Sequence, residues 1–573
     1  QKKAVVIKES IGAERLSKVG ISNASAATTK ISGVTKSEGS GDIYIRGLGD
    51  RYLSTTMNGL PIPSDNVANK NIDLSLFSTN VINNIGISKT YNTSGYADQA
   101  SGNVDITSKK YSKKGFGVSV TGGYNSAVLG LNSGFRNTLN MNDVTFGYHK
   151  KPFLLADAIK YQGWDPIKVN NDANYSISLN GSYKLNIFEK ELALFATASH
   201  NKSFEYQEGE FRTFRANVLD NAFPNLNYNP ETALNDSPSV EQYVTKINTT
   251  GYIRGDLKLN DDHKLSYNTL FVNTGTDNLY EQGRDGLGYV FDQQPQERGA
   301  FVRDQNYKQT IMFVNQLIGE HKISENNKLS WASGYNFILA EEPNRIRNEG
   351  VILNNSEVTY ADVSDFSQRK SSQRIEDNEF NGFVLNEYSF GKTKDEYEDK
   401  PLKLNLGANF RYKERAFRSQ FIGVSTPGFT PGFSNSGFLV PTMDNITNTF
   451  SNLSNYSSVA DPKLRVIEQL ADLYSADMMN IAGFANLDFG LNSKFSGNVG
   501  LRFERNEIKI NWNVKNYQGP DGQARVGSLG KEYNSIYPSL NLKYQLNDRN
   551  SIRFASSLTQ TLPEFKEFAP FQY

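Results

Sequence analysis

The stretch Ile43–Pro61, IYIRGLGDRYLSTTMNGLP, decides how the N-terminal part of this chain folds. Its dipeptide Asn58-Gly59 predicts a tight hairpin, because a type I′ turn needs positive φ at both central residues. Gly47 lies at a second point where the chain must reverse sharply. The neighbouring Arg46 carries fixed guanidinium donors that suit pairing with carboxylates or backbone carbonyls in a packed polar interface. We therefore expect a small, turn-rich globule here.

A second stretch, Gly95–Ser108 (GYADQASGNVDITS), completes this pattern further along the chain. A strand ending in Ile-Arg-Gly, an Asn-Gly turn before proline and a later Gly-Asn-Val-Asp-Ile-Thr strand occur in order at plausible spacing. Together they resemble the plug domain of TonB-dependent outer-membrane receptors. The resemblance implies that Arg46 lies between the plug and a barrel wall. The plug-motif residues are Arg46, Gly47, Asn58, Gly59, Gly102 and Asn103. The alternative is a soluble α+β domain with a surface arginine.

Composition excludes several classes of protein. Lys+Arg and Asp+Glu both number 61 in 573 residues, which argues against a nucleic-acid partner, because such binding needs clustered excess base. The chain has no cysteine, so it can form neither disulfides nor thiolate metal sites. The four histidines, His149, His200, His263 and His321, are expected to lie apart on the surface and to bind no metal. No catalytic constellation stands out, so we expect no enzyme and no cofactor.

The expected elements of the plug are short. A short strand is predicted at AVVIKE, residues 4–9, followed by a helix from about Ser10. A second short helix is expected within Ile21–Gly33, a further element at Ile72–Thr79 and a strand at Ile85–Tyr91. Residues 5–7 superficially resemble the box that pairs with TonB, but a first plug strand is the favoured interpretation.

From Gly115 onward, apolar and polar residues alternate strictly. Clear examples are Tyr175–Leu185, Ile253–Leu259, Leu402–Lys413 and Leu540–Gln545. Such alternation predicts strands with one face in oil and the other in water. A tilted membrane strand needs about 9 to 11 residues, whereas about 20 apolar residues would be needed for a membrane helix, and no such run occurs. The 30 Tyr and 35 Phe fit the aromatic girdles of a membrane barrel.

The connections between these strands alternate in length. Short ones are expected at 186–190, 260–263, 324–328, 391–400, 492–494 and 547–550, and long ones at 126–173, 205–246, 276–304, 342–379, 419–477 and 512–533. Short periplasmic turns and long extracellular loops are typical of outer-membrane barrels.

The predicted fold is therefore a membrane all-β antiparallel barrel with an N-terminal α+β plug inside it. We expect the plug at residues 1–112 and the barrel at residues 113–573. Roughly thirteen strands can be counted, whereas plugged receptors have about 22, so only part of the barrel is expected here, with its C-terminal strands missing. The last visible strand, Ser551–Thr561, is expected to lead into an extracellular loop at Pro570–Tyr573.

One expected loop contains a near tandem repeat, Thr426–Phe429 followed by Thr430–Phe433. Phe429, Phe433 and Phe438 are candidate contacts for a ligand or a partner protein. Packing of the loop onto its neighbours is an equally good interpretation. The tripeptide Arg254-Gly255-Asp256 lies inside an alternating strand, so its likeness to a cell-adhesion motif is attributed to chance.

The resemblance implies a receptor for energised uptake of a scarce substrate across the outer membrane of a Gram-negative bacterium, most like those of the Bacteroidetes. Its implied partners are the TonB-ExbB-ExbD complex and outer-membrane lipid. Residues 55–59, TTMNG, depart from the glycan-importing subfamily, which usually shows a Tyr-Val-Val-Asp-Gly type strand there. A surface lipoprotein or another outer-membrane protein as partner is thus open but not implied. The alternative function is a structural subunit of an outer-membrane protein-export or assembly complex. A passive porin is disfavoured because porins lack an N-terminal plug.

Overall fold

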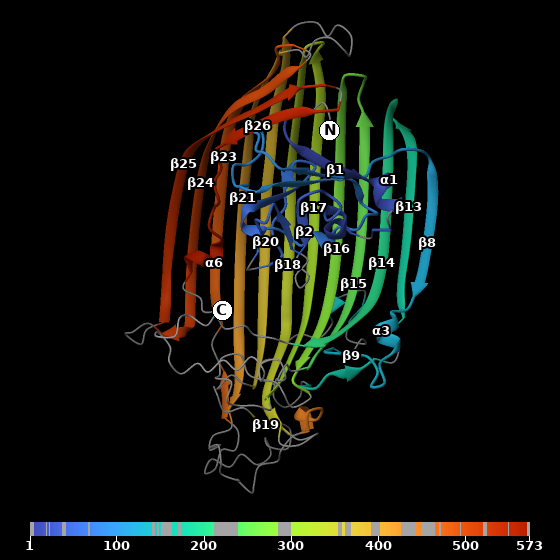
Figure 1. The fold of residues 1–573 in the computed structure, drawn as a ribbon, viewed down its shortest axis with the longest axis vertical. Coiled ribbons are helices and arrows are strands. Elements are labelled where there is room, and N and C mark those ends of the chain that lie inside the picture. Colours follow the sequence, from blue (N-terminus) through green and yellow to red (C-terminus); the bar gives the residue numbers. More distant parts are fainter. Residues whose placement is uncertain are drawn as a thin grey trace.

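Two sheets organise the chain in the computed structural model (Figure 1). The structure describes residues 5–18, 20–21, 23–36, 42–66, 69–139, 144–145, 148–149, 163–169, 173–210, 239–284, 300–352, 358–360, 368–390, 402–425, 442–448, 465–468, 471–492, 494–518, 524–547 and 549–569. A small mixed sheet belongs to residues 8–108, and a large antiparallel sheet begins at Gly115. We call residues 5–108 the plug and the large sheet the wall.

The plug is built on a five-stranded sheet with the order β1-β6-β7-β4-β5, in which β4 runs parallel to β7. Its elements are β1 (Lys8–Gly12), α1 (Ala13–Lys18), α2 (Ala24–Thr28), β2 (Val34–Lys36), β3 (Ile43–Ile45), η1 (Asp50–Tyr52), β4 (Leu53–Met57), β5 (Leu60–Pro61), η2 (Leu74–Leu76), β6 (Ile82–Ser88) and β7 (Gly102–Ser108). Buried aliphatic residues from every strand of this sheet except β5 share one core.

The first elements of the plug differ from the prediction. The strand begins at Lys8 and the helix at Ala13, each several residues later than the sequence pattern indicated. The reason is pairing in the folded plug, because Ile11 lies opposite Ile85 in the β1–β6 ladder and is buried there. Tertiary pairing thus overrides the capping signal at Ser10. The second predicted helix is confirmed as α2, whose Asn23 side chain accepts a hydrogen bond from the Ala26 amide.

The wall follows the chain order, with neighbouring strands antiparallel throughout. Its strands are β8 (Gly115–Gly123), β13 (Asn174–Ile187), β14 (Lys190–Glu210), β15 (Ser239–Lys258), β16 (His263–Gln282), β17 (Ala300–Ser324), β18 (Asn327–Ile352), β20 (Gln368–Phe390), β21 (Leu402–Ser425), β23 (Asp472–Gly490), β24 (Phe495–Gln518), β25 (Ala524–Gln545) and β26 (Ser551–Ser557). The strand ends joined by short connections lie at the upper end of Figure 1, and the strand ends joined by long connections lie at the lower end, so the two kinds alternate as predicted. Among the described residues, β8 and β26 each pair with one strand only, so the wall is an open trough.

The two faces of the wall differ as the alternation predicted. Ile177, Leu179 and Ile253 point outward, with 44 to 54% of their surface exposed. Polar residues between such positions point inward, and Asn268 and Arg502 are fully buried. An apolar outer face is what lipid requires, and the inner face is free to bind a polar plug.

The strands are much longer than expected. β17 has 25 residues and β18 has 26, well beyond the roughly 9 to 11 residues that cross a bilayer. Part of each segment predicted as a long loop is therefore strand. Residues 512–518 and 524–533, for example, form the ends of β24 and β25. Apolar alternation stops where lipid stops, but the backbone ladder continues, so the sequence pattern could not locate the true ends.

The remaining elements are short. They are α3 (Ser126–Leu129), β9 (Arg136–Asn137), β10 (Val144–Thr145), β11 (Tyr148–His149), β12 (Ile167–Lys168), β19 (Val358–Tyr360), β22 (Arg465–Glu468) and α6 (Phe565–Phe568). The described helices include none that is long and apolar enough to cross a membrane. The predicted strand from Ser551 is also shorter than expected, because the chain leaves the sheet after Ser557.

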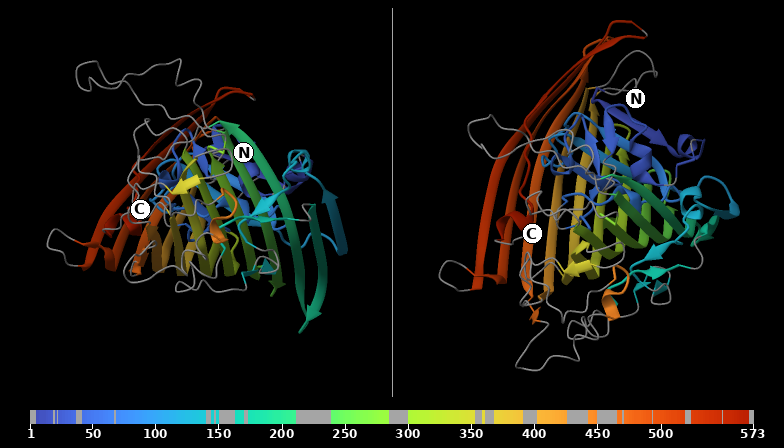
Figure 2. Two further views of the ribbon diagram at one scale, coloured as in Figure 1. Left: turned by 90° about the horizontal axis from the view of Figure 1, so that it is seen from below. Right: turned by 60° about the horizontal axis from the view of Figure 1, so that its bottom comes forward.

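The plug lies on the concave side of the wall (Figure 2). Its core continues into buried wall residues of β15 to β18, among them Leu270, Val314 and Ile338. Part of the interface between the plug and the wall is therefore apolar, and polar contacts hold other parts of the plug.

Candidate functional site

The predicted Asn58-Gly59 turn joins the plug to the wall. Both residues have positive φ, 52° and 82°, as a type I′ turn requires. The Asn58 side-chain amide donates to Gln316 Oε1 of β17 at 2.7 Å, and Gln316 Nε2 donates to the Met57 carbonyl at 2.8 Å. The Gly59 amide donates to the Asp105 carboxylate at 2.8 Å. The turn is thus held by both the plug and the wall.

The end of the plug is held beside the same turn. The Ser108 amide donates to Asn58 Oδ1 at 3.0 Å, and Arg254 of β15 donates to the Ser108 hydroxyl at 3.2 Å. Asp256 orients Arg254 through an ion pair of 2.9 Å. Arg254 and Asp256 are both buried, so the tripeptide that resembles an adhesion motif faces the plug and not the solvent.

The other glycine motif lies inside the plug. A Cβ at Gly102 would come within 2.5 Å of the Ser88 carbonyl oxygen, so β6 and β7 can approach closely only with glycine here. The neighbouring Asn103 side-chain amide donates to Thr56 Oγ1 at 3.2 Å, which ties β7 to β4.

Arg46 lies in the tight reversal of the chain predicted at Gly47. Its side chain is exposed and its φ is 53°, while Gly47 has a φ of 79°. The Ile45 amide donates to the Leu48 carbonyl at 2.9 Å and so closes the tight reversal expected at Gly47. Arg46 is thus exposed beside the described part of the wall, and its place between the plug and a barrel wall stays a prediction.

Residues 61–66 form a second contact with the wall. Asn336 and Asn381 both donate to the Pro61 carbonyl oxygen at 2.9 Å. The buried Asp65 accepts from Lys308 Nζ at 2.8 Å and from the Thr310 hydroxyl at 3.2 Å. Burial raises the pKa of Asp65, but the charge and hydrogen bond of Lys308 together with hydrogen bonds from Asp73 and Thr310 hold the pKa below its ordinary value.

Residues 91–98 form the third contact, on the far side of the plug. Asn541 donates to the Tyr91 carbonyl at 3.0 Å, and Arg502 donates to the Thr93 carbonyl at 3.2 Å. The Glu504 carboxylate accepts from the Ala97 amide at 2.8 Å. Most wall contacts therefore reach backbone groups of the plug.

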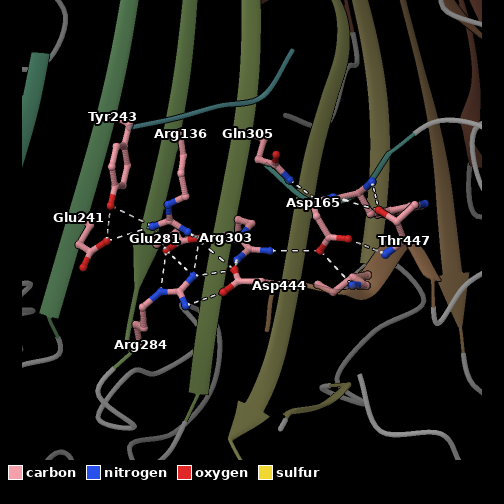
Figure 3. Close-up of polar contacts among 12 residues, drawn as sticks. Arg136, Asp165, Glu241, Tyr243, Glu281, Arg284, Arg303, Gln305, Asp444 and Thr447 are labelled. Carbon is pink, nitrogen blue, oxygen red and sulfur yellow. Dashed lines mark hydrogen bonds and ion pairs between the residues drawn. The ribbon is translucent and has the colours of Figure 1, made fainter. Parts of the chain in front are cut away.

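A charged cluster lies where β16 ends and β17 begins (Figure 3). Its centre is Glu281 at the end of β16, whose side chain is 1% exposed. Glu281 pairs with Arg136 at 2.8 Å, with Arg303 at 2.7 Å and with Arg284 at 2.8 Å. Burial of the charged Glu281 carboxylate costs free energy, and the ion pairs with the three arginines offset that cost.

Asp444 joins the cluster from a separate connection. It pairs with Arg303 at 2.6 Å and with Arg284 at 3.0 Å. Burial raises the pKa of Asp444, but the surrounding arginines lower it well below its usual range.

A second carboxylate fastens the same connection. Asp165 accepts from the amides of Ile446 and Thr447 at 2.9 and 2.8 Å, and Thr447 Oγ1 accepts from the Trp164 amide. Residues 442–448 are thus clamped between residues 163–169 and the wall. These contacts can hold residues 163–169 and 442–448 against the wall, or release both segments if the contacts break.

Sequence reasoning missed this cluster. Glu281, Arg284 and Arg303 lie in a segment that we predicted as loop, and nothing in their spacing distinguishes buried charges from solvated ones. The candidate contacts Phe429, Phe433 and Phe438 lie outside the described residues.

The histidines also differ from the prediction. His263 and His321 are cross-strand partners with their Nδ1 atoms 3.1 Å apart, and His200 lies in the middle of β14. The strand register brings together two histidines that are distant in sequence. Within the described residues, no group of three or more His, Cys, Asp or Glu side chains could hold a metal ion.

Family comparisons match both ends of the chain. Residues 1–104 match the TonB-dependent Receptor Plug Domain, and residues 433–573 match the Outer membrane protein beta-barrel family. A comparison with curated proteins found no match.

Solved structures share the fold. The siderophore receptor PiuA from Acinetobacter baumannii is 10% identical with a TM-score of 0.53, and the match covers 96% of this chain and 64% of that one. The ferric yersiniabactin uptake receptor FyuA from Yersinia pestis is 10% identical with a TM-score of 0.51, covering 95% and 62%. The copper transporter OprC is 11% identical with a TM-score of 0.52, covering 95% and 63%. This chain thus spans less than two thirds of each of these structures.

The plug and barrel matches, together with the shared fold, place the protein in the outer membrane of Gram-negative bacteria. The chain belongs to the TonB-dependent outer-membrane receptors.

Proposed function

We propose that this protein takes up a scarce extracellular substrate across the outer membrane in an energised step. The observation that carries the proposal is the way the plug is seated. Wall side chains donate to plug carbonyls at Met57, Pro61 and Thr93. Water can replace each of these bonds, so each adds only about 0.5 to 1.5 kcal/mol to the seating.

Together these hydrogen bonds hold the plug firmly against the wall. Each bond is weak enough to break singly, as displacement of the plug by pulling requires. We propose that the pull comes from the TonB-ExbB-ExbD complex through an extended segment on the periplasmic side of the plug. Strand pairing suits this role, because main-chain hydrogen bonds can bear force. The names of the three similar structures, a siderophore receptor, an uptake receptor and a copper transporter, support uptake over a purely structural role.

We further propose that the plug extends to residue 112 and that the barrel begins at residue 113. In the membrane the wall needs additional strands beside β8 and β26. An open edge in hydrocarbon would leave backbone N–H and C=O groups unpaired, at several kcal/mol each.

The test is uptake with and without TonB. The full-length protein is purified from its host, and compounds that co-purify are identified by mass spectrometry. Uptake of the identified compound is then measured in cells with and without TonB. We expect uptake to be lost without TonB, and uptake at the wild-type rate in those cells would refute the proposal.

A further inference from the structure

After β26 the chain turns onto the concave face of the wall. Leu558 to Ala569, which we call the strap, includes α6 and lies in front of the inner wall in Figure 1. Leu562, Phe565 and Ala569 are buried against wall residues of β20, β21, β23 and β24. The Phe565 ring lies 5.3 Å from Lys413 Nζ, within range of a cation–π contact.

The strap also binds the plug directly. The Gln560 amide donates to the Ala97 carbonyl at 3.0 Å, and the Leu562 amide donates to Asp98 Oδ1 at 3.0 Å. Glu567 forms an ion pair with Arg51 of η1. Two separate parts of the plug, near residues 51 and 97, are thus bound by one segment.

One wall carboxylate joins all three parts. Glu504 accepts from the Ala97 amide of the plug with Oε1, at 2.8 Å, and from the Gln560 side chain of the strap with Oε2, at 3.0 Å. Glu504 is fully buried, and wall side chains hold it in place, because Arg502 donates to Oε1 while Asn480 and Asn506 donate to Oε2. A carboxylate fixed by the wall thus binds the plug through one oxygen and the strap through the other.

The strap closes a small space above the plug. A cavity of about 60 Å³ is lined by plug residues Ser54 and Asn71, by Asn480 of the wall and by Glu564 of the strap. The wall, the plug and the strap thus line one cavity together.

We propose that the strap is a latch that holds the plug against the wall, with Gln560 and Glu567 as its positioning residues. Displacement of the plug then requires release of the strap from residues 97–98 and from Arg51. The idea rests on the proposed function, in which the plug moves, but it concerns what resists that movement.

The test pulls on the plug without substrate or TonB. Full-length protein in lipid is held by an N-terminal handle, and the lifetime of the seated plug at constant force is recorded. Gln560→Ala combined with Glu567→Gln removes the bond to Glu504 and weakens the ion pair. The glutamine introduced by Glu567→Gln can still accept from the Glu564 amide, a bond of 3.1 Å that Glu567 makes in the native chain. We expect the lifetime to shorten about tenfold.

Glu532→Gln is the matched control, because it weakens an exposed pair with Arg505 at 3.1 Å away from the plug. We expect it to leave the lifetime unchanged. An unchanged lifetime in the strap variant, or an equal change in the control, would overturn the proposal.

A disulfide gives a second measurement. The chain has no cysteine, so Ala97→Cys with Gln560→Cys adds a single possible bridge. When the bridge is oxidised, the chain pulled out of the wall should end at residue 97. The released length should then be shorter than that of the full plug by about 15 residues, roughly 50 Å of extended chain. Reduction should restore the full length. Full release from the oxidised protein would contradict the latch. Both measurements stand even if uptake proves independent of TonB.

Discussion

Replacing Glu281 with glutamine tests the charged cluster most directly. The substitution keeps the shape of the side chain but removes the charge at the centre of three arginine pairs. Removing one partner from a buried ion-pair network costs about 3 to 5 kcal/mol, because the remaining charges stay buried without compensation. Arg303 has no exposed surface, so water cannot replace the lost carboxylate without a local opening.

The consequence should appear in the connection that Asp444 anchors. Asp444 shares Arg284 and Arg303 with Glu281, so loss of Glu281 misplaces both partners of Asp444. At about 1.4 kcal/mol per factor of ten, the amides of Ile446 and Thr447 should lose about a hundred- to a thousand-fold of their protection. The loss of protection reaches its limit when the connection is open all the time, because the amides then have no protection left to lose. Hydrogen exchange of these two amides is the assay.

Glu205→Gln provides the control for this experiment. It removes the carboxylate of an exposed pair with Lys246 at 3.2 Å, and exposed pairs contribute little to stability. Unchanged protection in Glu281→Gln, or the same loss in Glu205→Gln, would refute the view that Glu281 holds the two connections together.

Three further predictions follow from the seat and the topology. Gln316→Ala leaves Asn58 and the Met57 carbonyl without their wall partner. Hydrogen exchange of the amides at Met57–Gly59 should therefore rise about tenfold. Unchanged exchange would show that the turn does not need the wall. Because Lys308 depresses the pKa of Asp65, its contribution is full above the unfolded value near 3.8 and is lost as pH falls through the lower folded value. Seating measured by hydrogen exchange should therefore persist at pH 4 and weaken below it, and Asp65→Asn should abolish that dependence; an unaltered pH profile in the variant would contradict this. In whole cells a cysteine at Gly428 should react with an impermeant reagent and one at Asn260 should not, and the reverse pattern would invert the proposed topology.

The sequence alone determined the class of fold and its order along the chain. Alternation in stretches such as Tyr175–Leu185 specifies which side chains meet lipid, because successive residues of a strand point to opposite faces. The Asn58-Gly59 hairpin was equally predictable, since its backbone conformation depends on those two residues. These signals are local, and local signals can be read without a structure.

Only the tertiary structure decided where strands end and which charges are buried. Beyond the bilayer both faces of a strand can be polar, so β17 and β18 continue with no apolar pattern to mark them. Glu281 reaches Asp444 across more than 160 residues of sequence through Arg284 and Arg303, and Gln560 reaches Ala97 across more than 460. Arg46 carries the family motif, and the local reversal at Gly47 leaves its side chain exposed beside the described part of the wall. The sequence shows the same residue type whether a charged or amide side chain is solvated or buried. Only the curvature of the wall around the plug determines which of these side chains are buried.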